Sequence, residues 1–290
     1  MNPISGTKDK QRIRELISDY LLVRNVSFEF FSTNASGDYS FLEEKILSEN
    51  VKNIIVIGGD GTISQVANAL RHLDVNFGVI PSGSGNGLAL AAGISRDPVK
   101  ALDTILNGKP SPVDAFYING HFSCMLSGIG FDAKVAHDFS KTKKRGLLAY
   151  VKVSMKNFFS AKEYPFQLKI NGKEIDTEAY FISIANSNQF GNNFTIAPRA
   201  SLSDGLLDII VVQKMNKLQV LLSIFYQIKY GDVQEEIFKR HGILYYQVKD
   251  LEILNPGMAP LHIDGDPYET ASGFSISIIP SAFRLIHPSI

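Results

Sequence analysis

The pattern of hydrophobic and polar positions changes near residue 110. Before this point, short apolar runs alternate with segments in which apolar residues recur at helical spacing. After it, apolar and polar residues alternate in short runs that turn residues separate. The first pattern is typical of a parallel α/β sheet, and the second is typical of antiparallel β structure.

The same periodicities assign individual elements. In the first part we expect helices over residues 9–22, 39–47 and 63–73, and strands over 26–31, 54–57 and 77–80. In the second part we expect strands over 113–118, 121–126, 166–170, 174–184, 206–212, 243–254, 261–263 and 274–279, and helices over 147–159 and 218–230. Asn-Gly pairs at 119–120 and 171–172 are strong signals for two-residue hairpins.

Two glycine-rich turns follow predicted strands in the first part. They are residues 58–62 (GGDGT) and residues 81–87 (PSGSGNG), and each precedes a predicted helix. In a parallel sheet both turns would open at the same edge. Glycine lets a ligand approach the backbone, and free N–H groups at a helix start attract phosphate, so the pair predicts a nucleotide site.

Asp60 is the unexpected residue in the first of these turns. A carboxylate repels phosphate unless a cation neutralises it, so Asp60 suggests a metal-binding or catalytic role. The alternative is an ordinary strand-to-helix turn in which Asp60 caps the helix.

The chain of 290 residues is long enough for two domains with separate cores. We predict an α/β plus all-β fold, with a doubly wound nucleotide-binding α/β domain over residues 1–112. An antiparallel β domain for the substrate is predicted over residues 113–275, and residues 276–290 are expected to pack back on the first domain.

Composition excludes several classes of protein. The 29 basic and 29 acidic residues give a net charge of zero, which argues against a nucleic-acid partner. Cys124 is the only cysteine, so intrachain disulfides and Cys-rich zinc sites are excluded, and a reducing cytoplasm is the simplest location. No apolar run reaches the roughly 18 residues that span a bilayer, so any membrane contact would be made from the surface.

Six blocks of sequence together resemble the catalytic domain of the diacylglycerol kinase and sphingosine kinase family of lipid kinases. They are residues 2–6, 58–62, 81–89, 191–200, 203–208 and 264–267, in the family order. The bacterial members of the family are the most similar. The resemblance implies a phosphofructokinase-like α/β domain joined to a β-sandwich, with the active site between them.

The resemblance also implies that ATP binds to the first domain. The residues expected to contact it are Asn2, Ser5, Gly6, Thr33, Gly59, Asp60, Gly61, Thr62, Ser84, Gly85 and Asn86. Ser84 stands where the bacterial family usually has threonine, and it keeps the hydroxyl. This version of the second turn is more similar to the sphingosine kinase variant, so the identity of the lipid substrate is not decided.

By resemblance, Asp204 binds a structural Mg²⁺, and backbone carbonyls near Ser201 and Leu206 complete the shell of oxygen ligands. From the residues alone, the Ser-Asp-Gly run would be a simple turn. Asp114 stands where the family has an aspartate that links the two sites through hydrogen bonds.

The run of residues 263–267 (IDGDP) would be a hairpin turn from the residues alone. The resemblance implies that it supplies the general base for the lipid hydroxyl, with Asp266 in place of the common glutamate. Because aspartate is one methylene shorter, either the backbone compensates, or Asp264 is the base and Asp266 helps with metal.

Two further features stand apart from the family blocks. Family members usually have an apolar strand before the block at residues 2–6; here the strand is lost or the start is late, and its absence would leave a neighbouring strand edge unpaired. The basic cluster Lys141, Lys143, Lys144 and Arg145 precedes the predicted helix 147–159. Cluster and helix are expected either to dock on anionic lipid or to form a core helix with a solvated loop.

These observations predict an ATP- and Mg²⁺-dependent lipid kinase that acts on a diacylglycerol-like or sphingoid alcohol. The enzyme would be cytoplasmic and peripherally membrane-associated. The sequence does not decide whether it forms a homodimer. The alternatives are an NAD kinase-like enzyme, which also has a GGDGT block, and a catalytically silent lipid- or nucleotide-binding module.

Overall fold

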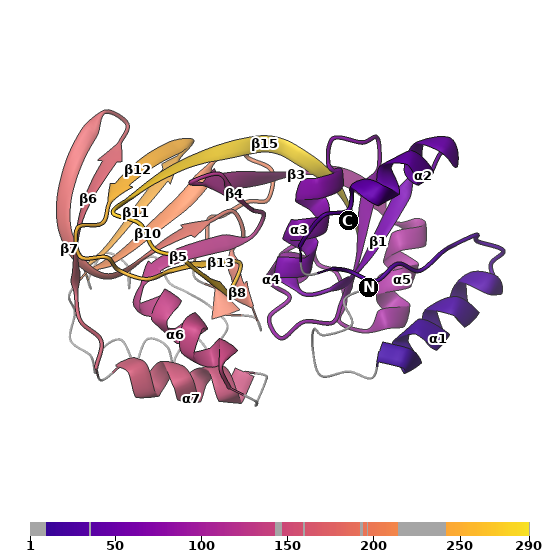
Figure 1. The fold of residues 1–290 in the computed structure, drawn as a ribbon, viewed down its shortest axis with the longest axis horizontal. Helices are drawn as coiled ribbons and strands as arrows, with labels where there is room; N and C mark the ends of the chain where they lie inside the picture. Colours follow the sequence, from indigo (N-terminus) through magenta and orange to yellow (C-terminus); the bar gives the residue numbers. More distant parts are fainter. Residues whose placement is uncertain are drawn as a thin grey trace.

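The computed structural model describes residues 10–34, 36–142, 147–158, 160–191, 194–195, 197–213 and 242–289. The helices are α1 (Lys10–Leu22), η1 (Ser40–Leu42), α2 (Glu43–Ser48), α3 (Asp60–Leu70), α4 (Gly87–Ala91), α5 (Pro98–Asn107), α6 (Phe131–Ser140) and α7 (Leu147–Phe158). The strands are β1 (Asn53–Gly58), β2 (Asn76–Pro81), β3 (Lys109–Ile118), β4 (His121–Ser123), β5 (Leu126–Gly130), β6 (Tyr164–Ile170), β7 (Lys173–Ala185), β8 (Gln189–Gly191), β9 (Phe194–Thr195), β10 (Leu207–Gln213), β11 (Ile243–Val248), β12 (Asp250–Leu254), β13 (Leu261–Ile263), β14 (Asp266–Tyr268) and β15 (Gly273–His287). They form a mixed α/β half and a largely antiparallel β half (Figure 1).

The first half is built on parallel strands. β1 pairs with β2 in parallel, and Gly58 lies opposite Pro81 at their carboxyl ends. β15 adds in parallel to β2 at Arg284 and Leu285. The two glycine-rich turns therefore leave the sheet at the same edge, as the sequence predicted.

The second half is an antiparallel β structure with α6 and α7 along one side (Figure 1). Its strands follow the order β15-β12-β6-β7-β5-β13-β14, and β10 pairs with both β7 and β11. Both predicted Asn-Gly hairpins are present: φ is 49° and 82° at Asn119 and Gly120, and 50° and 74° at Asn171 and Gly172. Positive φ at both central residues is the signature of a type I′ turn.

Two long strands connect the halves. β15 pairs with β12 at its start and with β2 near its end, and β3 pairs with β15 along most of its length. The pairing shifts register between Ile279 and Phe283, where Ser281 has a φ of 51°. The C-terminal part of β15 thus lies in the sheet of the first half, and the halves share paired backbone.

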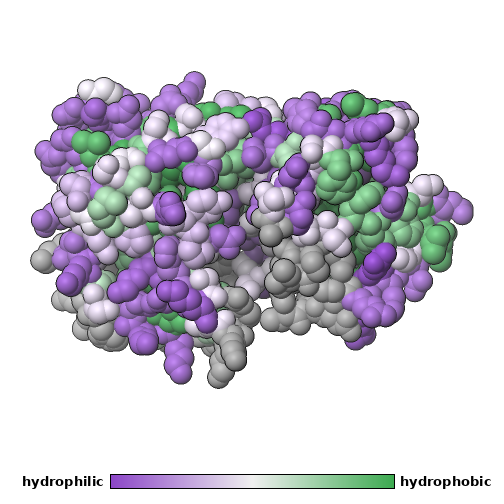
Figure 2. Space-filling model, viewed as in Figure 1, coloured by the Kyte–Doolittle hydropathy of each residue, from purple (hydrophilic) through white to green (hydrophobic). Residues whose placement is uncertain are grey.

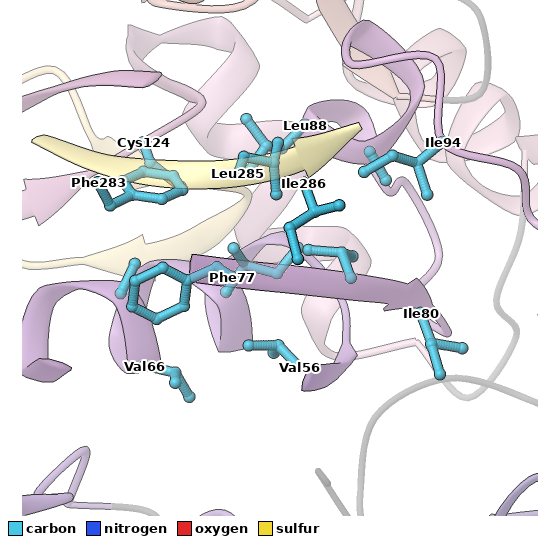
Figure 3. Packing of buried hydrophobic residues seen from close by; sticks show 14 of the residues in the cluster. Val56, Val66, Phe77, Ile80, Leu88, Ile94, Cys124, Phe283, Leu285 and Ile286 are labelled. Carbon is cyan, nitrogen blue, oxygen red and sulfur yellow. The ribbon is translucent and has the colours of Figure 1, made fainter. Parts of the chain in front are cut away.

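The core of the first half gathers around β2 and the end of β15. The Phe77 and Phe283 rings meet edge to face at 5.5 Å, with Val56 and Val66 on the other side of β2 (Figure 3). Phe77 and Cys124 are fully buried. Removing such side chains from water supplies the main driving force for folding.

Several details differ from the prediction. The expected strand 121–126 is two strands, β4 and β5. Residues 26–31 were expected to form a strand, but they pair with no other strand in the described part of the chain; Phe28 and Phe30 pack on the core instead. Among these residues, β1 is paired on one side only, with β2. The expected strand 243–254 is two strands, because β11 pairs with β10 and β12 pairs with β15. Finally, α3 begins at Asp60, three residues before its first apolar side chain.

Most of the surface visible in Figure 2 is hydrophilic, with apolar residues gathered toward the end where α1 and α2 lie. Leu22 at the end of α1 and Leu47 in α2 are among the exposed apolar side chains. None of the described helices is long and apolar enough to cross a bilayer. Residues 1–9, which include Asn2, Ser5 and Gly6, lie outside the described residues, as do residues 143–146 and the predicted helix 218–230.

Candidate active site

The two glycine-rich turns pack backbone to backbone. A Cβ on Gly59 would lie 3.0 Å from the Cα of Gly83, so a side chain at either position would push the turns apart. The backbone N–H of Ser82 donates to the carbonyl of Gly58 at 2.9 Å. Gly59 and Gly83 are therefore required for the close contact between the turns. The two turns together form one continuous wall.

Asp60 joins this wall to the start of α4. Its Oδ2 accepts from the N–H of Gly87 at 3.0 Å and its Oδ1 accepts from the N–H of Leu88 at 3.1 Å. Burial raises the pKa of the Asp60 carboxyl, and these N–H groups oppose that rise. The carboxylate thus caps a helix, but that helix is α4 and not α3, which Asp60 itself begins.

Asn86 fixes the shape of the second turn. It has a φ of 56°; its Oδ1 accepts from the N–H of Gly83 at 2.8 Å, and its Nδ2 donates to the carbonyl of the same residue at 2.9 Å. Ser84 and Gly85 lie half-buried between these residues. The turn is therefore held in one conformation by its own side chains.

The DGD run is a type I′ hairpin turn between β13 and β14. Ile263 pairs with Asp266, and φ is 49° at Asp264 and 86° at Gly265. The turn interpretation made from the residues alone is confirmed. The same turn also lies beside the candidate site, because it contacts the wall formed by the two glycine-rich turns.

Asp264 is buried and fully engaged in hydrogen bonds. Ser64 of α3 and Ser123 of β4 donate their hydroxyls to its carboxylate, the latter at 2.7 Å. The backbone N–H groups of Met125 and Leu126 donate to its Oδ1 at 3.2 and 3.1 Å. Burial raises the pKa of Asp264 to about 6, against the effect of these donors. The carboxylate therefore connects the DGD turn to both halves of the molecule.

Asp266 is exposed, and its carboxylate lies against the GGDGT turn. A Cβ on Gly61 would be only 2.6 Å from the Oδ2 of Asp266. The absence of a side chain at Gly61 thus leaves room for an acid from the other half. Two runs about 200 residues apart in the sequence meet at this point.

Asp114 and Asp204 lie at the junction of β3, β15 and the SDG turn. Asp114 is buried; its Oδ2 accepts from the N–H of Gly205 and its Oδ1 from the N–H of Ser281, both at 2.7 Å. Asp204 is exposed, and its Oδ1 accepts from the N–H of Leu206 at 3.0 Å. Ser201 closes the turn by accepting from the N–H of Ser203 at 3.4 Å. Asp114 is thus a structural link, and Asp204 is the member of the pair that a cation can reach.

Within the described residues, no three His, Cys, Asp or Glu side chains are grouped closely enough to hold a metal ion by themselves. Any cation here would need backbone carbonyls, water or phosphate oxygens as further ligands. Thr33 follows the extended segment 26–31 and is half-buried.

Comparison with known proteins identifies the arrangement. Residues 1–118 match the family model of the diacylglycerol kinase catalytic domain, and residues 126–287 match the YegS C-terminal NAD kinase beta sandwich-like domain. A diacylglycerol kinase of Bacillus subtilis (strain 168) is 30% identical over 277 residues, which cover 91% of this chain and 88% of that protein. The chain belongs to the diacylglycerol kinase family of lipid kinases.

Other relatives agree with this assignment. A YegS-like lipid kinase of Xanthomonas oryzae pv. oryzae (strain MAFF 311018) is 27% identical over 295 residues, covering 97% of this chain and 93% of that protein. The fold is similar to the crystal structure of a diacylglycerol kinase from Bacillus anthracis str. Sterne, with a TM-score of 0.73 and 21% identity over 99% of this chain and 94% of that chain. At that identity the structural likeness concerns the fold alone.

Sequence reasoning missed the residues that hold the DGD turn in place. Ser64 follows Thr62 by two positions on α3, and Ser123 ends β4, so neither lies in a recognisable motif. Tyr268, two residues beyond Asp266 on the same strand, was missed too; its ring lies 5.0 Å from the ring of His121. Burial raises the pKa of Tyr268, and the nearby carboxylates of Asp266 and Asp264 add to that rise. Only the alternation along β14 could have indicated that Tyr268 and Asp266 share a face.

Proposed function

We propose that this protein is an ATP-dependent kinase that transfers the γ-phosphate of ATP to a hydroxyl group of a lipid alcohol. The observation that carries the proposal is the contact between Asp266 and Gly61. It brings an exposed acid of the second half to the start of α3, where free N–H groups favour phosphate. An acid beside a phosphate site is suited to accept the proton of an attacking hydroxyl.

The nucleotide would lie on the wall formed by the two glycine-rich turns. Gly59, Gly61 and Thr62 belong to the start of α3, and Ser84 and Gly85 to the outer part of the second turn. Absence of side chains at the glycines lets phosphate oxygens reach backbone N–H groups. Family resemblance adds further contacts from Thr33 and from Asn2, Ser5 and Gly6.

Asp266 is the general base in this proposal, and Asp264 is not. Four donors already occupy the Asp264 carboxylate, whereas Asp266 is exposed at the wall. The lipid hydroxyl donates its proton to Asp266 while its oxygen attacks the γ-phosphorus; the bond from phosphorus to the β,γ-bridging oxygen breaks, and ADP leaves. In this proposal the shorter side chain of aspartate is long enough to reach the lipid hydroxyl, because β14 places it directly against Gly61.

Magnesium fits the site in two places. Asp204 offers an exposed carboxylate on a tight turn whose carbonyls, including those of Ser201 and Leu206, are hard oxygen donors of the kind Mg²⁺ takes. At the nucleotide, Asp266 would contribute negative charge beside the phosphates, whereas both oxygens of Asp60 accept from the N–H groups of Gly87 and Leu88. A bound Mg²⁺ would supply neutralisation of phosphate charge, which phosphoryl transfer requires. Asp114 would support the Asp204 turn through the N–H of Gly205.

Access to the lipid would come from a peripheral contact with the membrane surface. On α7, Lys152, Met155 and Lys156 are exposed, whereas Phe158 is buried against the ring of Phe131. The helix therefore has one face in the core and one with basic residues around an apolar side chain. Basic residues near an anionic bilayer contribute on the order of 1 kcal/mol each, and Lys141 at the end of α6 would add to them. Charge reversal of Lys152 and Lys156 should weaken binding to anionic vesicles; equal binding by the variant would contradict this contact.

The decisive experiment combines a substrate panel with one variant. Purified protein, labelled ATP and Mg²⁺ are incubated with diacylglycerol, monoacylglycerol, sphingoid base, ceramide or phosphatidylglycerol, and products are separated by thin-layer chromatography. Asp266→Asn should lower kcat on the preferred lipid by about 10²- to 10⁴-fold, the usual contribution of general base catalysis. Asp250→Asn, which changes an exposed acid of β12, is the matched control and should leave kcat unchanged.

The same assay addresses the two alternatives. Formation of NADP with NAD as the acceptor would show an NAD kinase-like enzyme. ATP consumption with none of the lipids, and no NADP, would favour a catalytically silent binding module. Wild-type kcat in Asp266→Asn would overturn the role assigned to this residue.

A further inference from the structure

A buried acid–histidine pair lies behind the DGD turn. Asp132 in α6 is 5% exposed and His262 in β13 is 1% exposed, and the Nε2 of His262 lies 3.4 Å from the Oδ2 of Asp132. Charged or ionisable groups are seldom buried unless they are paired. The pair also lies outside the motifs that define the nucleotide site, so its place in the fold requires a reason.

A glycine makes room for the pair. On β5, Gly128 lies directly opposite His262 in the ladder with β13. A Cβ on Gly128 would collide with the carboxylate of Asp132 and would lie 2.6 Å from the Nε2 of His262. Any other residue at this position would separate the two side chains or displace α6. The third glycine-rich run of the chain, residues 127–130, thus serves this pair and not a phosphate.

The other ring nitrogen of His262 holds the DGD turn. Its Nδ1 accepts from the backbone N–H of Gly265 at 3.2 Å. An accepting Nδ1 carries no proton, so the neutral ring carries its proton on Nε2, which faces Asp132. The carboxylate of Asp132 favours this tautomer, and the tautomer in turn favours the bond to Gly265.

The consequence concerns Asp266, the next residue after Gly265. The turn is fixed on its first residue by the hydrogen bonds of Asp264 and on its second by His262. Asp266 follows at once and must meet Gly61 from the other half of the molecule. A small rotation of the turn would move the Asp266 carboxylate away from the attacking hydroxyl, and a displacement of about 1 Å can cost about 100-fold in rate.

We infer that His262, oriented by Asp132, is a positioning residue that sets the location of the Asp266 carboxylate. This inference rests on the proposed kinase function. His262 touches neither substrate in this scheme; it acts only through the N–H of Gly265.

Two conservative substitutions separate the two contacts of His262. In His262→Asn the amide oxygen takes the place of Nδ1 and can still accept from Gly265, whereas the contact with Asp132 is lost. In His262→Gln the amide lies near the place of Nε2, so Asp132 keeps a partner and Gly265 loses its acceptor. Both variants keep a polar side chain at a buried position, so their unfolding in urea is measured alongside activity.

The expected result is a difference between the variants. His262→Gln should lower kcat by about 10- to 100-fold with little change in the KM for ATP, and His262→Asn should restore most of that loss. In an Asp266→Asn background, His262→Gln should cause little further loss. Amide exchange at Gly265, measured by NMR without substrates, should be faster in His262→Gln than in wild type or His262→Asn.

Equal kcat in wild type and His262→Gln would overturn the inference. An equal loss in both variants, in step with lower stability, would do so as well, since it indicates a structural role alone. The amide exchange measurement requires no activity. If wild type phosphorylates no lipid while exchange at Gly265 responds as expected, the proposed function fails and the contact to the turn stands.

Discussion

Substitution of Gly61 by alanine should separate the stability of this protein from its activity. Gly61 lies in the first turn of α3, and its φ is not in the left-handed region, so the backbone accepts alanine without strain. The added methyl group would lie 2.6 Å from the Oδ2 of Asp266, which is closer than atoms in contact can approach. The Asp266 side chain must therefore move.

The two effects on stability nearly cancel. Alanine in place of glycine stabilises a helix by roughly 0.5–1 kcal/mol. Rotation of Asp266 out of its present position costs about 0.5–1.5 kcal/mol. The free energy of unfolding should consequently change by less than about 1 kcal/mol. The loss of kcat should be much larger, about 10²- to 10⁴-fold, because the general base leaves the attacking hydroxyl.

The assay measures kcat and the KM for ATP on the preferred lipid, together with urea unfolding, for Gly61→Ala, Asp266→Asn and the double variant. If Gly61→Ala acts through Asp266, the double variant should be no slower than Asp266→Asn alone. Gly273→Ala is the control: a Cβ there would meet its nearest neighbours at 3.7 Å, an ordinary contact, far from the site. A rise in the KM for ATP with unchanged kcat would refute the reasoning, since Gly61 would then act on the phosphates and not on Asp266.

Three further predictions follow from buried groups and from the proposed metal. Burial raises the pKa of Asp264 to about 6, so this carboxyl contributes stability that is lost as pH rises from about 4 to about 6. Between pH 4.5 and pH 7, the free energy of unfolding of wild type, measured in urea, should fall by about 2 kcal/mol relative to that of Asp264→Asn. If the difference between the two proteins is the same at both pH values, the burial of this acid is contradicted. Burial also raises the pKa of the Cys124 thiol, so a thiol reagent should modify the protein only after unfolding, and rapid reaction of the native protein would be contrary evidence. A chelator should abolish lipid phosphorylation and added Mg²⁺ should restore it, whereas full activity in the chelator would exclude the proposed metal.

Local signals in the sequence predicted most of the fold. Helical periodicity located α1, and the strand–glycine–helix pattern located β1, β2 and the turns between them and the helices. The Asn-Gly pairs predicted both hairpins because only a few residues adopt positive φ at low cost. Segment 26–31 forms no strand with the residues that the structure describes. Alternation of apolar residues indicates burial of one face, but a strand also needs a neighbouring strand to pair with, and the alternation does not predict that neighbour.

The sequence indicated candidate motifs for the site, but it did not indicate the contacts between them. The GGDGT run was recognisable from the residues, whereas the DGD run gained a role only through the family resemblance. Their meeting at Gly61 depends on the position of β14 relative to α3, which the second half of the chain sets. The side-chain partners of Asp264 are two serines without a motif, which tertiary packing brings from α3 and β4. Sequence spacing carries no information about such contacts, because the residues involved are 141 and 200 positions apart.

The three acids of the two central motifs differ chiefly in their surroundings. Asp60 and Asp264 are buried with their oxygens on hydrogen-bond donors, so each joins two parts of the structure. Asp266 alone of the three is exposed, and its carboxylate lies against Gly61 in the opposite half. The sequence motifs make all three acids equal candidates for a catalytic role. Proton transfer, however, requires a carboxylate that the substrate hydroxyl can reach. In the proposed reaction, the two buried acids would therefore act indirectly, by holding the turns that lie on either side of Asp266.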